Sequence, residues 1–127
     1  MSAYGDAAVH AAQLCHKQGL DPVAAWTRAV EELLPTVEGR KKSCPKSAFV
    51  GLCEEGLIQD VPRGSYTRSH LNKEYALRAL QLLKDDTARK WTSGALWRVV
   101  MAGEEKKPNS QMEVVIALWS KGMCEAR

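Results

Sequence analysis

Residues 48–58 read AFVGLCEEGLI and residues 114–124 read VVIALWSKGMC. In both stretches an apolar pattern with helical spacing ends at a glycine, and two apolar residues follow that glycine. At an offset of 66 residues, Leu52 aligns with Leu118 and Gly56 aligns with Gly122. These paired stretches predict two helices with the same ending, and therefore a chain whose second half repeats its first.

The repeat continues towards the N-terminus at an offset of 71 residues. The aligned pairs there are Tyr4 with Tyr75, Ala8 with Ala79, and Trp26 with Trp97. A linker that is shorter in the second half accounts for the change in offset. We therefore predict an all-α fold of six helices, built as two related three-helix halves over residues 2–58 and 72–124. The two halves would pack together as a single domain of residues 1–127, because three helices alone bury little core.

Helix ends are marked by capping residues. Asp21 followed by Pro22 is typical of a helix start, and Asn72 is expected to cap the fourth helix. Residues 59–71 lack a helical period and contain Pro62 and Gly64. We expect this connector between the halves to be a loop or a small β-hairpin.

Composition excludes several classes of protein. The chain has 127 residues, 45% of them hydrophobic and 26% charged, with a net charge of +3, which is ordinary for a globular protein and argues against disorder. No apolar run is long enough to span a membrane, and no secretory signal is evident, so a cytoplasmic location without membrane contact is expected. The four cysteines have no metal-ligand spacing, and the glycine-rich nucleotide-binding motifs are absent. We therefore expect no metal and no cofactor.

Positive charge is concentrated in one third of the chain. Residues 39–73 hold seven basic and three acidic residues, whereas the remainder holds eleven basic and twelve acidic residues. Basic side chains next to an aromatic residue favour contact with the phosphates and bases of nucleic acid, or with another acidic partner. We expect a small binding module whose contact residues are Arg40, Lys41, Lys42, Lys46, Arg63, Tyr66, Arg68 and Lys73.

Three alternatives remain open. Cys44 precedes Pro45 and is expected at a helix N-cap, where the helix dipole and Lys46 would favour the nucleophilic thiolate of a small thiol-dependent enzyme. The same residues are compatible with a structural or protein-interaction domain. The order of the third helix and the Pro62-Arg63-Gly64 segment also resembles the recognition helix and wing of winged helix-turn-helix proteins.

Three segments resemble a family of short uncharacterised bacterial proteins. They are Cys44-Pro45-Lys46-x-Ala48-Phe49-x-Gly51-Leu52-Cys53-Glu54, Gly64-x-Tyr66-Thr67-Arg68 and Asn109-Ser110-Gln111-Met112. The resemblance spans nearly the whole chain. It implies a bacterial, stand-alone cytoplasmic protein, and it assigns no activity and no functional residue.

Overall fold

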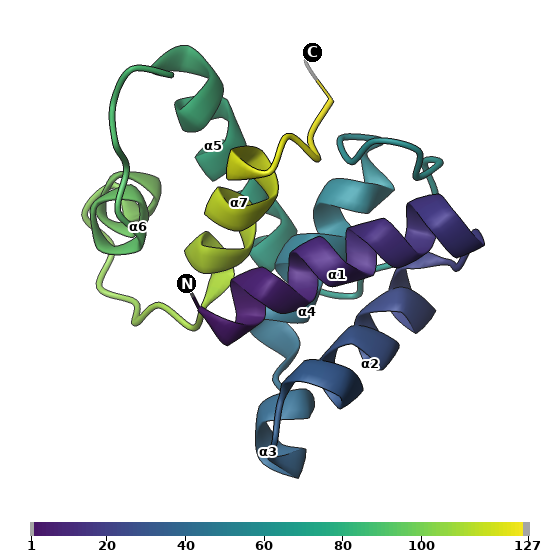
Figure 1. Cartoon of the computed structure of the whole chain (residues 1–127). Helices are drawn as coiled ribbons and strands as arrows, with labels where there is room; N and C mark the ends of the chain where they lie inside the picture. The colour runs from purple at the N-terminus through teal and green to yellow at the C-terminus, as the bar shows by residue number, and fades with distance from the viewer. Residues whose placement is uncertain (1, 126–127) are drawn as a thin grey trace.

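The computed structural model describes residues 2–125, and these form an all-α fold (Figure 1). Six helices of nine residues or more follow one another: α1 (Ala3–Gln18), α2 (Pro22–Leu33), α4 (Ser43–Glu54), α5 (His70–Asp85), α6 (Ser93–Met101) and α7 (Gln111–Ser120). The predicted all-α class with six main helices is confirmed. Within the described residues the connector contains no strand, so it is a loop and not a hairpin.

Side-chain caps fix the first two helices where the sequence predicts them. The hydroxyl of Ser2 accepts a hydrogen bond from the backbone N–H of Gly5 at 3.0 Å. Gly19 follows α1 in the left-handed region at φ 66°, which glycine adopts without steric cost. Asp21 caps α2 by accepting from the Val23 N–H at 3.0 Å. These contacts satisfy backbone groups that a helix end leaves without partners.

Three local features differ from the sequence-based predictions. A single-turn helix, α3 (Val37–Arg40), lies in the segment expected to be a plain linker. The fourth main helix, α5, begins at His70, because Ser69 and not Asn72 provides the cap. Ser110 lies in the left-handed region without a side-chain cap bond, and the Gln111 side chain accepts from the Asn109 N–H at 2.6 Å instead.

Helix α7 lies among the other long helices and packs against α1, α4, α5 and α6 (Figure 1). Its residues Met112, Val114 and Leu118 are fully buried. Aromatic rings extend this core on either side of α7. Trp26 stacks on Phe49 with ring centroids 5.7 Å apart, and Tyr75 meets Trp97 edge to face at 5.4 Å.

The ends of α4 and α7 are joined by a short antiparallel bridge between Ile58 and Cys124. The backbone N–H of Gln59 donates to the Met123 carbonyl at 2.9 Å, and the N–H of Glu125 donates to the Leu57 carbonyl at 2.8 Å. A shift of 66 residues exchanges these two bonds with each other. The correspondence does not extend to all packing, because α5 packs along α7 while α1 makes no comparable contact with α4 in the described residues.

None of the helices within residues 2–125 combines the length and the apolar character that crossing a membrane requires.

Candidate functional site

A pocket of about 430 Å³ lies between the first turns of α4 and the last part of the connector. Its wall on the α4 side begins at the first residue of that helix, and residues 66–68 form the opposite wall. The lining residues are Val23, Ser43, Lys46, Ser47, Val50, Tyr66, Thr67 and Arg68. None of them is acidic, so the charged side chains at this pocket are cations.

Three of the eight predicted binding residues meet in this pocket. Lys46 reaches it from α4, and Tyr66 and Arg68 reach it from the connector. Lys41 and Lys42 are exposed and directly precede Ser43, the first residue of α4. The pocket therefore joins two parts of the chain that the sequence separates by about 20 residues, and both parts are basic.

The connector is held against α4 by the carboxylate of Glu54. One carboxylate oxygen, Oε1, accepts from the backbone N–H groups of Tyr66 at 2.7 Å and Thr67 at 3.1 Å. The hydroxyl of Tyr66 donates to the Pro62 carbonyl at 2.8 Å. These bonds replace the strand pairing that a hairpin would have provided, and they fix the backbone that carries Arg68.

The other oxygen of Glu54 pairs with Lys73. The ammonium of Lys73 lies 2.6 Å from Glu54 Oε2 and 2.9 Å from Oε2 of Glu55. The hydrogen bond from Lys73, followed by the two backbone donors at Tyr66 and Thr67, lowers the pKa of Glu54 to about 2. Lys73 is thus engaged within the protein and does not line the pocket, contrary to the expectation that it forms part of the binding surface.

Two other predicted residues also lie outside the pocket. The Nε of Arg40 donates to the Leu34 carbonyl at 2.7 Å. The stem of Arg63 lies against Gly56, just beyond α4, with its Cγ 2.8 Å from the point that a Cβ on Gly56 would occupy. Because α4 has 12 residues and is about 18 Å long, Arg63 is at the far end of that helix from Lys46. The predicted cations do not form one continuous surface.

The sequence analysis did not single out the hydroxyl groups of the pocket. Ser43, Ser47 and Thr67 all line it, and Ser47 is buried. The spacing of Ser43, Ser47 and Val50 by four and three residues places them on one face of a helix, next to Lys46. That spacing was a usable signal once residues 43–54 were expected to be helical.

Cys44 does not occupy the position expected for a reactive thiol. Helix α4 begins at Ser43 with Lys42 as the N-cap residue, so the thiol belongs to the second helical residue. Pro45 is tolerated one position later than expected, because the first four N–H groups of a helix have no intrahelical partner. Among residues 2–125, His10 pairs with Glu32 and His16 pairs with Asp60, and no hydrogen bond joins a histidine to Cys44. The structure therefore provides no base for the thiol-enzyme alternative.

The other three thiols lie in the interior. Burial raises the pKa of Cys15 and of Cys124 to about 11, and it raises that of Cys53 further. In the part of the chain that the structure describes, no group of three or more His, Cys, Asp or Glu side chains is arranged to hold a metal ion. The connector likewise contains no strand there, so the wing implied by the helix-turn-helix resemblance is not formed.

Comparison of the chain with curated proteins and with solved structures gave no match. A family model described as a family of unknown function (DUF6979) matches residues 1–125, almost the entire chain. This match agrees with the resemblance to an uncharacterised family noted from the sequence. The chain is a helical member of this family of unknown function, DUF6979.

Proposed function

We propose that this chain is a helical binding module for a phosphate-bearing ligand, and that the pocket between α4 and residues 66–68 is its binding site. The observation that carries the proposal is the convergence of Lys46, Tyr66 and Arg68 on one pocket that has no acidic lining residue. The proposal narrows the predicted contact set to these three residues, with Lys41 and Lys42 next to them.

The chemistry of the pocket suits a phosphate group. An ammonium and a guanidinium supply charge, and Arg68 can present two parallel N–H donors to a phosphate. The hydroxyls of Ser43, Ser47 and Thr67 supply neutral donors around them. The pocket also meets the first turn of α4, where backbone N–H groups and the helix dipole favour an anion.

Single-stranded nucleic acid is the phosphate-bearing partner that these residues favour. Lys41 and Lys42 extend the positive charge beyond the pocket, as the repeated phosphates of a strand require. Tyr66 is half-buried in the pocket wall, and its ring offers a face on which a base can stack. Binding of a strand would place one phosphate at Lys46 and Arg68 and a neighbouring base at Tyr66.

Fluorescence anisotropy across a salt series tests the proposal. We expect labelled single-stranded oligonucleotides to bind the intact chain at low salt and to dissociate as salt increases. Lys46→Gln and Arg68→Gln should each weaken binding and lower the salt slope by about one. Lys107→Gln, which changes an exposed lysine of the loop before α7, is the matched control and should change neither quantity.

Competition experiments separate the possible ligands. Mononucleotide or inorganic phosphate that displaces the oligonucleotide at similar concentration would indicate a small phosphorylated ligand in place of a strand. Displacement by an acidic peptide alone would indicate a protein partner. Absence of oligonucleotide and phosphate binding at low salt, or a salt slope that is the same in the intact chain and in both variants, would contradict the proposal.

We also infer that the frame of this site consists of two related halves. The exchanged bonds at the Ile58–Cys124 bridge support this inference. So do two lysine ammonium groups over tyrosine rings, Lys42 over Tyr4 at 5.8 Å and Lys106 over Tyr75 at 5.4 Å. Superposition of residues 3–58 on residues 74–124 in an experimental structure tests the inference, and long helices that fail to overlay would contradict it.

A further inference from the structure

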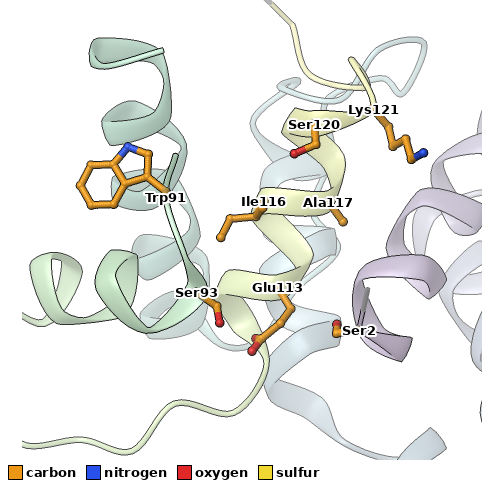
Figure 2. A pocket seen from close by; sticks show the side chains of 8 residues that line it. All are labelled: Ser2, Trp91, Ser93, Glu113, Ile116, Ala117, Ser120 and Lys121. Carbon is orange, nitrogen blue, oxygen red and sulfur yellow. The ribbon is translucent and has the colours of Figure 1, made fainter. Parts of the chain in front are cut away.

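A second pocket, of about 230 Å³, lies along α7 and shares no lining residue with the first (Figure 2). Helix α7 provides one wall, and the rest comes from the residue before α1, from the segment before α6 and from the start of α6. The lining residues are Ser2, Trp91, Ser93, Glu113, Ile116, Ala117, Ser120 and Lys121.

Two buried polar atoms at this pocket have no hydrogen-bond partner. They are the indole nitrogen Nε1 of Trp91 and the carboxylate oxygen Oε2 of Glu113. A third such atom, Nε1 of Trp26, belongs to a fully buried side chain that does not line this pocket. Buried polar groups without partners are rare in folded proteins because each carries a desolvation cost. Their presence on the same pocket indicates that a bound molecule supplies the missing partners.

The carboxylate of Glu113 determines the charge of that molecule. No ion pair to Glu113 is formed within residues 2–125. Lys121, the cation that lines the same pocket, is eight residues further on, about 12 Å along the helix direction. A carboxylate that is partly removed from water and lacks a cation is stabilised most by a ligand with a positive charge.

The remaining lining determines the body of the molecule. Ile116 and Ala117 present an apolar surface on α7 between Glu113 at one end and Ser120 at the other (Figure 2). The guanidinium of Arg89 lies 3.7 Å from the centre of the Trp91 ring and holds that ring in place. A neighbouring pocket shares Trp91, Ile116 and Ser120 and continues to Trp119 and Leu83, so an apolar group can extend beyond the first pocket.

We propose that this pocket binds a small organic cation, with a primary ammonium group at the Glu113 carboxylate and an apolar body against Ile116, Ala117 and Trp91. The hydroxyls of Ser2 and Ser93 line the same pocket and can accept the ammonium hydrogens that the carboxylate does not use. The indole N–H of Trp91 lies in the wall and changes environment when the pocket is filled.

Nuclear magnetic resonance of the full ¹⁵N-labelled chain tests this proposal. The indole N–H signal of Trp91 is assigned with Trp91→Phe and followed during titration with phenethylamine, 2-phenylethanol and 3-phenylpropionate. These probes share an aromatic body and differ in charge. We expect a saturable shift with phenethylamine, affinity about tenfold weaker for the neutral alcohol, and no binding of the anion, because a charge-assisted hydrogen bond is lost in the neutral probe.

Matched variants identify the residue responsible. Glu113→Gln keeps the shape of the side chain and should reduce phenethylamine affinity about tenfold, to the level of the alcohol. Glu105→Gln, in an exposed loop, should leave it unchanged. Ile116→Ala should weaken the amine and the alcohol equally, because it removes apolar contact and no charge. Lys46→Gln should leave amine binding intact, which separates this site from the phosphate pocket.

Three results would overturn the proposal. Failure of phenethylamine to produce a saturable shift would show that solvent alone partners the two buried atoms. Equal affinities for the amine and the alcohol would show that Glu113 does not select charge. Unchanged amine affinity in Glu113→Gln, in a variant whose spectrum retains native dispersion, would show that the cation binds elsewhere.

Discussion

The ammonium Nζ of Lys73, on α5, lies 2.6 Å from Oε2 of Glu54, near the end of α4. The same carboxylate holds the connector through the backbone N–H groups of Tyr66 and Thr67. The side chain of Glu54 is only 10% exposed, so this ion pair is better shielded from water than a surface pair. A single side chain therefore joins α4, α5 and one wall of the phosphate pocket.

Acid should weaken this junction. The folded-state pKa of Glu54 is lowered from 4.5 to about 2, so its contribution to stability is complete above about pH 4.5 and is lost as the pH falls towards 2. We expect Glu54→Gln to reduce the free energy of unfolding by about 1–2 kcal/mol at pH 7, a value discounted for solvent screening. Urea denaturation between pH 2 and pH 7 measures both effects.

Glu55→Gln is the control for this prediction. The Glu55 side chain is 46% exposed and contacts only Lys73, so its loss should cost less than about 0.5 kcal/mol. A Glu54→Gln variant that is as stable as the unchanged chain at pH 7, or that retains the full loss of stability between pH 4.5 and pH 2, would show that the junction does not depend on this carboxylate.

The main helices were predictable because their signals are local. Pro22 after Asp21 and the glycines at positions 19, 56 and 122 mark helix ends through backbone geometry that needs no tertiary contact. Helix α3 was missed because its four residues are too short to show a periodic pattern. The start of α5 was misplaced because Ser69 and Asn72 are both good caps, and tertiary contacts select between them.

The candidate site was only partly predictable for a different reason. Local charge density located Lys46 and Arg68, which do line one pocket. It also selected Lys73, whose pairing with Glu54 depends on how α4 packs against α5 and cannot be inferred from residues 19 positions apart. The α7 pocket left no sequence signal, because its residues come from three separate segments of the chain.

Thiol reactivity should distinguish Cys44 from the other three cysteines. Cys15, Cys53 and Cys124 are buried with raised pKa values, whereas the Cys44 side chain is partly exposed. We expect a disulfide reagent to modify one thiol of the native chain rapidly and the other three only after unfolding. Cys44→Ser should abolish the rapid phase. Rapid modification of two or more thiols in the native chain would contradict the burial of the other three.

Close packing between α4 and α5 predicts the effect of a single methyl group. A Cβ on Gly51 would lie 2.7 Å from the Cβ and 2.9 Å from the Cα of Lys73, so α5 would have to shift. We expect Gly51→Ala to lower the free energy of unfolding by about 1–3 kcal/mol. Gly94→Ala, where a Cβ meets nothing within 4 Å on α6, should be neutral or stabilising by up to about 1 kcal/mol. Thermal unfolding of both variants makes the comparison, and equal melting temperatures would contradict it.

Gly64 provides a way to alter the phosphate pocket without changing its charge. A Cβ at this position would lie 2.6 Å from the Cζ atom of Tyr66, so Gly64→Ala must displace the ring that lines the pocket and weaken its hydrogen bond to Pro62. We expect weaker oligonucleotide binding with an unchanged salt slope, because Lys46 and Arg68 remain. Ser65→Ala, at the exposed neighbouring position, should bind normally. Unchanged affinity in Gly64→Ala would show that the Tyr66 ring does not contact the ligand, while a changed slope would show that the alanine also displaces a cation.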